Sequence, residues 1–551
     1  LHGTIYKYSN GKWLEASLST VAELRSTEPT QAGQTVSVAS YYGGWAAVLN
    51  GEPKYGGKFW FDALDTTTLD DGFKCFVTPA GARWKRVRKQ YSVGHAGAVE
   101  DVTVDSTVQV QKAVDGTKSG AELQFVGGPF KFDEVELTKP IVLSGDAELY
   151  HNGFRIKTSD VHSSLSGWQN CAQYASTSRG FKCYAYLDGE DYSNIQLSYN
   201  KFRGFFYSSD MRGREYSATP SDPTNRVLKG ITLIGCISVA PTGLAAGHYQ
   251  HTGVTNAKAV ACSAYGGINA TSYNFINGNG FIIVSNCYDE NNTYGSLEIE
   301  NNLVSYGVVS GNVFGKQLWV DDTSNISITG NTVADRILIT AQSNDTDNLL
   351  VSGNNCTRVS ITKFGTAPTG RHKSVKLIGN TFTGQLGSND IFADDSVDRL
   401  VAESNSLNGL DSSAIAVVRS ANSDYLLRNN DSRTARPITI SGSGGKLVEY
   451  GNINTTTSGA TNSKHVSNLL KPYDDYLDLP GKYLHGTKYT GSIPVSSSAN
   501  IALAIPDSGP LSFRAISLWV LIRDSTSNNV SSYRIDGLHK IVGGVVNLTF
   551  G

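Results

Sequence analysis

The chain of 551 residues lacks the features that mark several classes of protein. No apolar run approaches the roughly 20 residues that a membrane helix needs, so we expect no membrane insertion. The net charge is −2 and no basic stripe is present, which disfavours nucleic acid and anionic membranes as partners. The chain begins at Leu1 without a signal peptide, which predicts a trimmed form of a longer protein.

Cysteine, methionine and charged residues are scarce. The seven cysteines show no metal-ligand spacing, so the sequence predicts no metal site, no other cofactor and no disulfide framework, and we expect Cys171 and Cys183 to stay reduced. Methionine occurs once and charged residues make up 17% of the chain, whereas glycine occurs 57 times. This composition is typical of a rigid, turn-rich all-β protein.

A short apolar strand followed by a small residue and an asparagine recurs along the middle of the chain. The asparagines of this pattern, mostly 19 to 26 residues apart, are Asn286, Asn312, Asn331, Asn354, Asn380, Asn405 and Asn452, with Asn430 inside the last, doubled spacing. Cys236 and Cys262 fall in the same register, so we expect buried thiols to continue the same inward column. A period in this range indicates a solenoid.

A second short strand follows each asparagine turn, for example at 297–300, 318–321 and 337–340. Alternation along such a strand places one set of side chains inside and the other outside. Each coil therefore contributes at least two strands to different sheets. The pattern predicts a parallel β-helix within residues 98–460.

The flanking segments predict separate structures. Residues 1–97 form an N-terminal module in which Thr20 and Glu23 make a capping box, and in which three tryptophans belong to the core: Trp45, Trp60 and Trp84. A helix over Asp105–Asp115, with Ser106 as its N-cap, is expected to cover the open end of the solenoid. Its expected apolar positions are Val108, Val110 and Val114.

Two further stretches break the period. Residues 158–226 are rich in aromatic side chains, including Trp168, and we interpret them as insertions that either form a binding surface or pack on the solenoid. Residues 461–551 contain three apolar strands, Ile501–Ile505, Ile516–Ile522 and Val545–Phe550, which predict a small C-terminal β-sandwich for trimerisation or glycan binding.

Three regions of the chain resemble bacteriophage tailspikes with a pectate-lyase-like, right-handed parallel β-helix. They are the N-terminal pattern (Thr20–Arg25, Tyr41–Gly44 and Gly56–Asp62), the helix at Asp105–Asp115 and the asparagine turns. The resemblance implies a homotrimeric spike of the virion tail that binds and usually cleaves a bacterial surface polysaccharide, either O-antigen or capsule. The N-terminal module would then contact other tail proteins. The fold itself does not determine the chemistry, because lyases and glycosidases share it.

The register of the coils indicates where a glycan-cleaving site would lie. The outward residues of the second strands form two columns: Glu298, Trp319 and Leu338 in one, and Glu300, Asp321, Thr340, Thr362 and Asp394 in the other. Glu300 and Asp321 would lie about 5 Å apart at the backbone on neighbouring coils.

Hydrolysis of a glycosidic bond needs two carboxyl groups, and repulsion between close carboxylates raises the pKa of one of them. We therefore predict that Glu300 and Asp321 are catalytic, with Asp322 or Glu298 as a further carboxylate and Trp319 stacking on a sugar. The short spacing fits a retaining enzyme, whereas a Glu298–Asp322 pair fits an inverting one. The alternative is a solvated acidic face.

Other arrangements remain open from the sequence. Asp394 and Asp395 lie near Asp398, Arg399, Arg371 and His372, a mixture that favours a structural salt-bridge cluster over a second site. A lyase would need a base, which His248, Tyr249 or His251 would supply, and we also expect Tyr249, His251 and Trp168 to contact substrate. Asp345 and Asp347 are a weak calcium candidate. A non-catalytic, glycan-binding adhesin is the alternative outside enzymes.

Overall fold

The computed structural model describes most of the chain. The described residues are 6–9, 12–15, 17–43, 53–172, 178–213, 228–239, 247–266, 271–276, 278–290, 295–300, 303–365, 368–384, 388–409, 413–442, 445–458, 464–465, 500–504, 513–523, 530–540 and 545–549. The chain divides into two compact units, Leu1–Asn468 and Leu469–Gly551. Trp45 and residues 214–227 lie outside the described part.

The N-terminal module contains a five-stranded sheet in the order β3-β4-β5-β7-β6. Its elements are β3 (Ser17–Thr20), α1 (Val21–Ser26), β4 (Thr35–Ser40), β5 (Tyr55–Phe61), β6 (Cys75–Val77) and β7 (Arg83–Arg86), preceded by a hairpin of β1 (Tyr6–Ser9) and β2 (Lys12–Glu15). Thr20 caps α1, since its side chain accepts the backbone N–H of Glu23 at 3.1 Å. Trp84 is buried as predicted, whereas Trp60 is 36% exposed.

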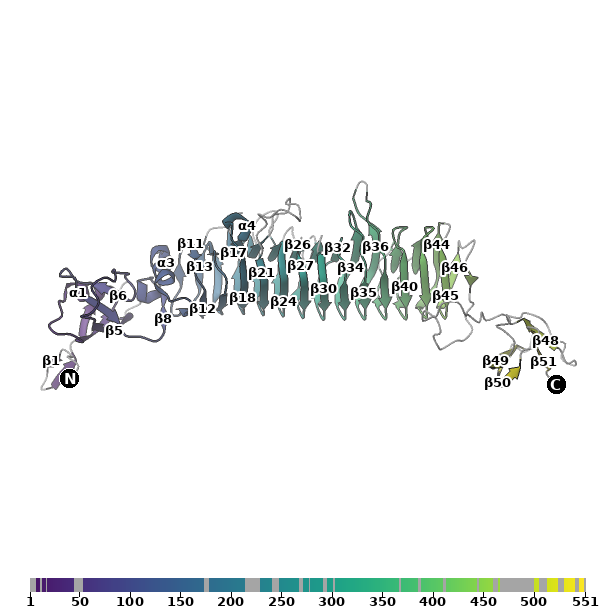
Figure 1. Ribbon diagram of the computed structural model, residues 1–551, viewed down its shortest axis with the longest axis horizontal. Helices are drawn as coiled ribbons and strands as arrows, with labels where there is room; N and C mark the ends of the chain where they lie inside the picture. Colours follow the sequence, from purple (N-terminus) through teal and green to yellow (C-terminus); the bar gives the residue numbers. More distant parts are fainter. Residues whose placement is uncertain are drawn as a thin grey trace. The chain divides into compact units, whose positions relative to one another are not determined.

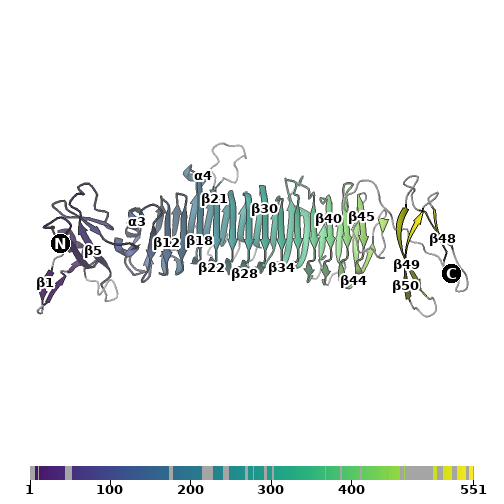
Figure 2. The ribbon, with the colours of Figure 1, turned by 60° about the horizontal axis from the view of Figure 1, so that its bottom comes forward.

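A helix lies between this module and the first coil, as the sequence predicts. It is α3 (Thr107–Gly116), preceded by β8 (Tyr91–Ser92) and the 3-10 helix η1 (Val93–Ala96). Figure 2 shows α3 at the end of the coil stack, where Gln111 exchanges two hydrogen bonds with the backbone of Glu136. Val110 and Val114 are buried, but Val108 is 61% exposed, because it lies on the solvent side of the helix.

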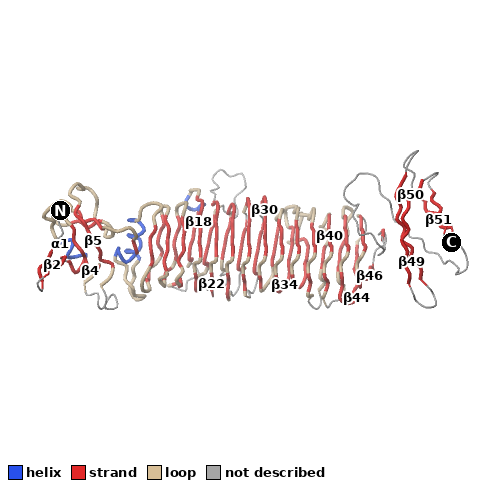
Figure 3. Tube along the Cα trace, turned by 90° about the horizontal axis from the view of Figure 1, so that it is seen from below, coloured by secondary structure: helices blue, strands red, loops and turns tan. Residues whose placement is uncertain are grey.

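Coils of parallel β-helix follow, each built from three strands in turn (Figures 1 and 3). The first ladder is a 16-stranded parallel sheet. It contains β8, β9 (Glu122–Phe125), β12 (Ile141–Gly145), β15 (Val161–Leu165), β18 (Tyr192–Ser198), β21 (Leu228–Ile234), β24 (Val254–Val260), β27 (Asn279–Ser285), β30 (Leu303–Ser310), β33 (Ile326–Thr329), β35 (Leu349–Ser352), β37 (Val375–Ile378), β40 (Arg399–Glu403), β43 (Asp424–Arg428), β45 (Lys446–Tyr450) and β47 (Lys464–His465).

The second ladder consists of short strands after the asparagine turns. It contains β10 (Phe130–Lys131), β13 (Leu149–His151), β16 (Trp168–Cys171), β19 (Lys201–Arg203), β22 (Ile237–Val239), β25 (Ser263–Tyr265), β28 (Tyr288–Asp289), β31 (Val313–Phe314), β38 (Thr381–Phe382) and β41 (Ser406–Leu407). Four long strands run from the second ladder into the third: β34 (Thr332–Ala341), β36 (Asn355–Lys363), β44 (Asp431–Ser441) and β46 (Ile453–Ser458).

The third ladder completes each coil. Besides the long strands it contains β11 (Glu134–Leu137), β14 (Gly153–Ile156), β17 (Arg179–Tyr184), β20 (Tyr207–Arg212), β23 (Tyr249–Thr252), β26 (Thr271–Ile276), β29 (Gly295–Glu300), β32 (Leu318–Asp321), β39 (Ile391–Ala393) and β42 (Ile415–Val418). One short helix, α4 (Ala185–Asp188), follows β17.

A column of buried side chains follows the turn between the first and second ladders. It comprises Asn200, Cys236, Cys262, Cys287, Asn312, Asn331, Asn354, Asn380, Asn405, Asn430 and Asn452. Each amide from Asn312 to Asn430 donates to the side-chain oxygen of the next asparagine at 2.8–3.0 Å. The thiols of Cys236 and Cys262 occupy the column as predicted, and the seven cysteines, all within the described residues, are buried and form no disulfide there.

The predicted register was wrong by one residue at Asn286. Asn286 is exposed at a φ of 53°, in the left-handed position that glycine holds in the neighbouring coils at Gly311 and Gly330. The inward position belongs to Cys287, whose backbone N–H donates to Asn312 at 2.8 Å. Asparagine fits both positions, because it tolerates a positive φ and also forms buried ladders, so the sequence pattern alone did not separate them.

The stretch 158–226, where the sequence predicts an aromatic insertion, contains longer coils. First-ladder Cα partners are 34 residues apart from Val161 to Ile195 and 36 apart from Ile195 to Ile231, against 26 from Ile231 to Ala257. Regular coils occupy this stretch from β15 to β20, apart from α4. The asparagine period fails there because these coils are longer. Aromatic rings fill part of their interior, where the ring centroids of Phe154 and Phe181 are 4.9 Å apart and Phe202 packs against Phe205. Among the aromatic residues of this stretch whose side chains the structure describes, Phe181, Tyr192, Phe202 and Phe205 are buried in the core, whereas Tyr199 is exposed and the others are half-buried.

The C-terminal unit contains two antiparallel strand pairs. The pairs are β48 (Asn500–Ala504) with β51 (Val545–Thr549), and β49 (Phe513–Arg523) with β50 (Val530–Lys540). The described residues of the three strands expected from the sequence lie in β48, β49 and β51, and Ile505 and Phe550 are outside the described part. Their packing into a sandwich stays a prediction.

Candidate functional site

Four carboxyl groups gather on β29, β32 and the residue after β32. The registers pair Glu298 with Trp319 and Glu300 with Asp321, as the sequence predicts. The alternate residues Leu297, Ile299, Leu318 and Val320 are buried in the interior. Alternation therefore turns both columns outward, and neighbouring strands hold their members about 4.8 Å apart at the backbone.

Glu300 has the most perturbed carboxyl group of the cluster. Burial raises the pKa of Glu300 to about 7, and the negative charges of Glu298, Asp321 and Asp322 contribute in that order. A carboxyl group with this pKa holds its proton at near-neutral pH and can deliver it to a leaving oxygen.

Glu298 lies two residues before Glu300 on the same face of β29. Its Oε2 atom accepts hydrogen bonds from Thr271 Oγ1 and from Asn274 Nδ2, both at 3.1 Å. Burial raises the pKa of Glu298, and the nearby charge of Asp321 adds to this effect, while the bond from Thr271 opposes it. Two residues of extended strand separate Glu298 and Glu300 by about 6.7 Å at the backbone.

Asp321 is 1% exposed and belongs to a hydrogen-bonded chain. Trp319 Nε1 donates to Thr340 Oγ1 at 2.7 Å, and Thr340 Oγ1 donates to Asp321 Oδ1 at 2.5 Å. Burial raises the pKa of Asp321, and the bond from Thr340 partly offsets that rise. This chain fixes the indole ring beside the carboxyl groups.

Asp322 holds a loop rather than facing solvent. It is 6% exposed, and its carboxylate accepts backbone N–H groups of Gln342 at 2.6 Å, Ser343 at 2.9 Å and Asn344 at 3.2 Å. These contacts favour a structural role for Asp322 and leave Glu298 as the second accessible carboxylate.

The sequence analysis missed an aromatic neighbour of this cluster. Phe364 packs edge-on against Trp319 with ring centroids 5.2 Å apart, and its side chain is 47% exposed. Phe364 follows Thr362 by two residues, so the outward column continued past the strand end would have identified it. Asn274, the Cα partner of Glu298, would have followed from the same register extended one coil back.

Three residues expected to act on substrate lie in the interior instead. Tyr249 is 1% exposed and stacks on Tyr273 with ring centroids 5.2 Å apart. His251 is 1% exposed and packs edge-on against Phe275. His248 is fully buried and bonded to Ser238. Burial lowers the pKa of His248 to about 3 and that of His251 to about 4. Their burial contradicts the prediction that these residues bind substrate or supply a base. Alternation along β23 turns Tyr249 and His251 inward, and His248 is buried just before that strand.

Trp168 lies apart from the carboxyl cluster. It is half-buried on β16 of the second ladder, with the guanidinium of Arg203 4.4 Å from the ring centroid. Four coil steps separate β16 from β28, the second-ladder strand of the Glu298 coil, which is about 19 Å along the axis. The structure does not bring Trp168 together with Glu300.

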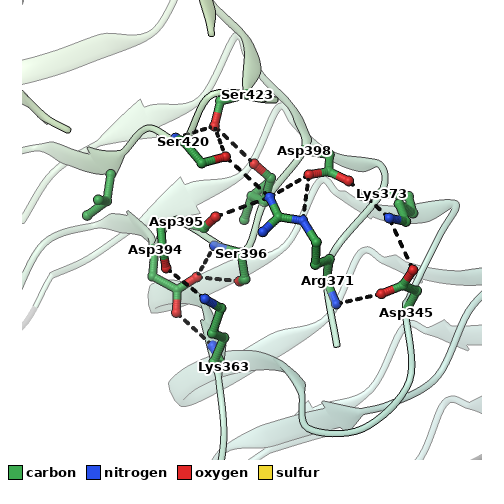
Figure 4. Close-up of polar contacts among 12 residues, drawn as sticks. Asp345, Lys363, Arg371, Lys373, Asp394, Asp395, Ser396, Asp398, Ser420 and Ser423 are labelled. Carbon is green, nitrogen blue, oxygen red and sulfur yellow. Dashed lines mark hydrogen bonds and ion pairs between the residues drawn. The ribbon is translucent and has the colours of Figure 1, made fainter. Parts of the chain in front are cut away.

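The rival group of acids and bases forms a network of ion pairs (Figure 4). Arg371 pairs with Asp398 at 2.5 Å, Lys373 bridges Asp345 at 3.1 Å and Asp398 at 3.3 Å, and Lys363 pairs with Asp395 at 3.1 Å. Asp394 accepts the backbone N–H of Lys363 at 2.7 Å. This is the structural salt-bridge cluster that the mixed charges favour.

His372 and the calcium candidate fit the same structural picture. His372 is fully buried between Thr346 and the carbonyl of Thr362. Asp345 is engaged by Lys373, and within the described part of the chain no group of three or more His, Cys, Asp or Glu side chains is placed to hold a metal ion. In the same residues, no helix has the length and apolar character needed to cross a membrane.

A comparison with protein families identifies the N-terminal module. Residues 17–89 match the family described as the phage tail protein small four-stranded β-sheet domain. Over these residues the chain is similar to a phage tail domain. The match contains the whole β3-β4-β5-β7-β6 sheet and ends before the coils begin.

One curated relative is similar to part of the chain. It is the Mu-like prophage FluMu defective tail fiber protein of Haemophilus influenzae, 38% identical over 104 residues. That match covers 18% of this chain and 16% of the relative. The chain therefore shares a limited segment with this relative.

Two solved structures are similar at low identity. The tailspike protein of Acinetobacter baumannii phage AM24 is 16% identical with a TM-score of 0.35, over 80% of this chain and 65% of that one. The gp42 tailspike of Acinetobacter phage vb_AbaP_AS12 is 13% identical with a TM-score of 0.38, over 97% and 93%. We draw no conclusion about activity from likeness at this level.

Proposed function

We propose that this protein is a phage tail component that binds a bacterial surface polysaccharide and hydrolyses its glycosidic bonds on the outward face of the third ladder. The observation that carries the proposal is the pKa of Glu300, raised to about 7 beside a second accessible carboxylate, Glu298. A protonated and an ionised carboxyl group on one open face are the pair that glycoside hydrolysis requires. The phage tail domain match supports a place in the virion tail. The proposal extends to a homotrimer that acts outside the bacterium on O-antigen or capsule.

Each residue of the site has a role in this proposal. Glu300 protonates the leaving oxygen, and Glu298 acts as nucleophile or activates water. Asp321 keeps the pKa of Glu300 high and, through Thr340, positions Trp319. Trp319 and Phe364 offer aromatic faces to the sugar.

The proposal is tested with a panel of purified O-antigens and capsular polysaccharides. New reducing ends are measured for the wild type, Glu298→Gln and Glu300→Gln. Each substitution should lower cleavage of the susceptible polymer about 10²- to 10⁴-fold, the range for loss of acid–base catalysis. Glu290→Gln is the control, because Glu290 is exposed on the second-ladder side of the same coil.

The other outcomes separate the alternatives. Cleavage at wild-type rate by both variants would remove the site assignment. Polymer that is retained by the protein without new reducing ends would identify an adhesin. An unsaturated sugar at the new chain end would identify a lyase.

A further inference from the structure

Two arginines of like charge lie against each other on the same outward face. Arg336 on β34 and Arg358 on β36 are Cα partners in neighbouring coils, about 4.8 Å apart at the backbone. Both are half-buried. Like charges opposite each other on paired strands are destabilising, so this pair costs stability unless something else compensates.

Neither arginine forms an ion pair with any residue that the structure describes. Arg336 Nε donates to Gln317 Oε1 at 3.1 Å, and Arg358 Nη1 donates to Ser388 Oγ at 2.8 Å. The Nε atom of Arg358 is buried without a hydrogen-bond acceptor. Burial and the charge of Arg336 lower the pKa of Arg358, and the negative charge of Asp335 opposes this shift.

The carboxylate of Asp390, which follows Arg358 in the outward column on the next coil, already has other partners. Asp390 pairs with Arg436 at 2.5 Å inside the coil and also accepts the backbone N–H of Gly409 at 3.2 Å. The arginine pair therefore presents guanidinium donors that the described neighbours leave without a carboxylate.

The pair lies close to the proposed catalytic groups. Arg336 is two residues before Leu338, whose Cα partner is Trp319, which in turn pairs with Glu298. Two coil steps and two strand residues separate Arg336 from Glu298 by about 12 Å at the backbone. A polymer bound across the carboxyl groups would reach the arginines one or more sugars away from the cleaved bond.

We propose that Arg336 and Arg358 bind the carboxylate of an acidic sugar, so that the substrate is an acidic polysaccharide containing uronic acid or another carboxylated residue. This inference rests on the proposed function. Guanidinium groups match carboxylates through paired N–H donors, and a bound anion would relieve the repulsion between the two side chains. The acidic sugar is a neighbour of the cleaved one, because the arginines lie too far from Glu300 to contact the same residue.

The inference is tested by binding, separately from cleavage. Full-length Glu300→Gln protein is titrated with a panel of purified uronate-containing and neutral bacterial polysaccharides. A polymer that binds is then converted to its carboxyl-reduced form with carbodiimide and borohydride. We expect the bound polymers to carry carboxylates, and we expect carboxyl reduction or Arg336→Gln each to weaken binding by about tenfold or more.

The carboxyl reduction and Arg336→Gln are also combined, to measure whether their effects on binding are independent. If the arginine binds the carboxylate, Arg336→Gln should have no further effect on the carboxyl-reduced polymer. Arg399→Gln is the matched control, since it removes the same charge from an exposed position on the first ladder. Thermal unfolding of each variant shows whether the fold is intact.

The remaining outcomes overturn the inference. Equal binding of native and carboxyl-reduced polymer, or wild-type binding by Arg336→Gln, would exclude a carboxylate at the pair. Cleavage of a neutral polymer would remove this inference and leave the proposed function standing. Binding of no polymer in the panel would overturn both.

Discussion

At the scale of single residues, the environment of Glu300 determines its chemistry. The side chain is at a strand end, half-buried, with three acidic groups acting on it. A lone glutamate on a solvated face would ionise below pH 5, whereas this one exchanges its proton near neutrality. The shift requires burial together with the crowding of carboxylates by the coil register.

The shift predicts a pH profile. Cleavage should require protonated Glu300 and should therefore fall as the pH rises through about 7. Asp321→Asn removes a charge that raises the pKa of Glu300, so it should move this alkaline limb to lower pH. The rate of reducing-end formation is measured against pH for both proteins. An alkaline limb at the same pH in the variant would show that Asp321 does not set it.

Stability should follow the same group. The pKa of Glu300 is higher in the folded chain, about 7, than its ordinary value of 4.5. The folded state therefore binds more protons between these values, and the stabilisation present below pH 4.5 is lost as the pH rises toward 7. The unfolding temperature of Glu300→Gln minus that of the wild type should therefore increase as the pH is raised from 4.5 to 7.

Asp322 gives a prediction of a different kind. Asp322→Ala removes the acceptor for three backbone N–H groups and places alanine at a φ of 44°. We expect a loss of about 1–3 kcal/mol of stability and faster proteolysis near 342–344. Asp322→Asn, which tolerates this φ and keeps an acceptor, should lose less. Equal stability of the alanine variant and wild type would contradict the loop-holding role.

At the scale of elements, the asparagine column ties successive coils together. Asn354 donates to Asn380 Oδ1 at 3.0 Å and to the carbonyl of Ile328 at 2.9 Å, and it accepts from the side chain and backbone of Asn331. The column therefore satisfies turn backbone groups that would otherwise be buried without partners.

Removing one member should be costly. Asn354→Ala leaves buried groups of its neighbours unpaired and should destabilise the chain by about 1–3 kcal/mol. Asn355→Ala is the control. Asn355 directly follows Asn354 but its side chain is exposed, so this substitution should change stability by less than about 0.5 kcal/mol. The difference in thermal unfolding between these two variants measures the column.

At the scale of the first unit, the third ladder extends beyond the site in both directions. The outward columns continue to Gln250 and Asn274 on one side and to Thr340 and Thr362 on the other. A polymer lying across the coils would contact the site in its middle, so we expect internal cleavage. Size-exclusion chromatography should show a fall in polymer length while few reducing ends have formed. Release of single sugars from polymer of unchanged length would contradict this expectation.

Sequence periodicity was sufficient for the repeat and for much of the site. The number of residues per coil and the two-residue alternation of side chains along a strand can both be read from the local sequence. They therefore placed Glu298, Trp319, Glu300 and Asp321 on the outward side in the correct pairs. The same argument failed at Asn286, because asparagine suits two adjacent positions. It lost the period across 158–213, because the coils there are 34 and 36 residues long.

The sequence by itself determined the coil, its inward column and the two outward columns, since each depends on the spacing of side chains along the backbone. Only the tertiary structure decided which of those side chains are available to contact a substrate. Tyr249 and His251 are buried in the core, and three backbone amides donate to the carboxylate of Asp322. Strand pairing places Arg336 beside Arg358 on the neighbouring coil. The reason is that desolvation and charge proximity arise between coils, from residues that are roughly 20 or more positions apart in the chain.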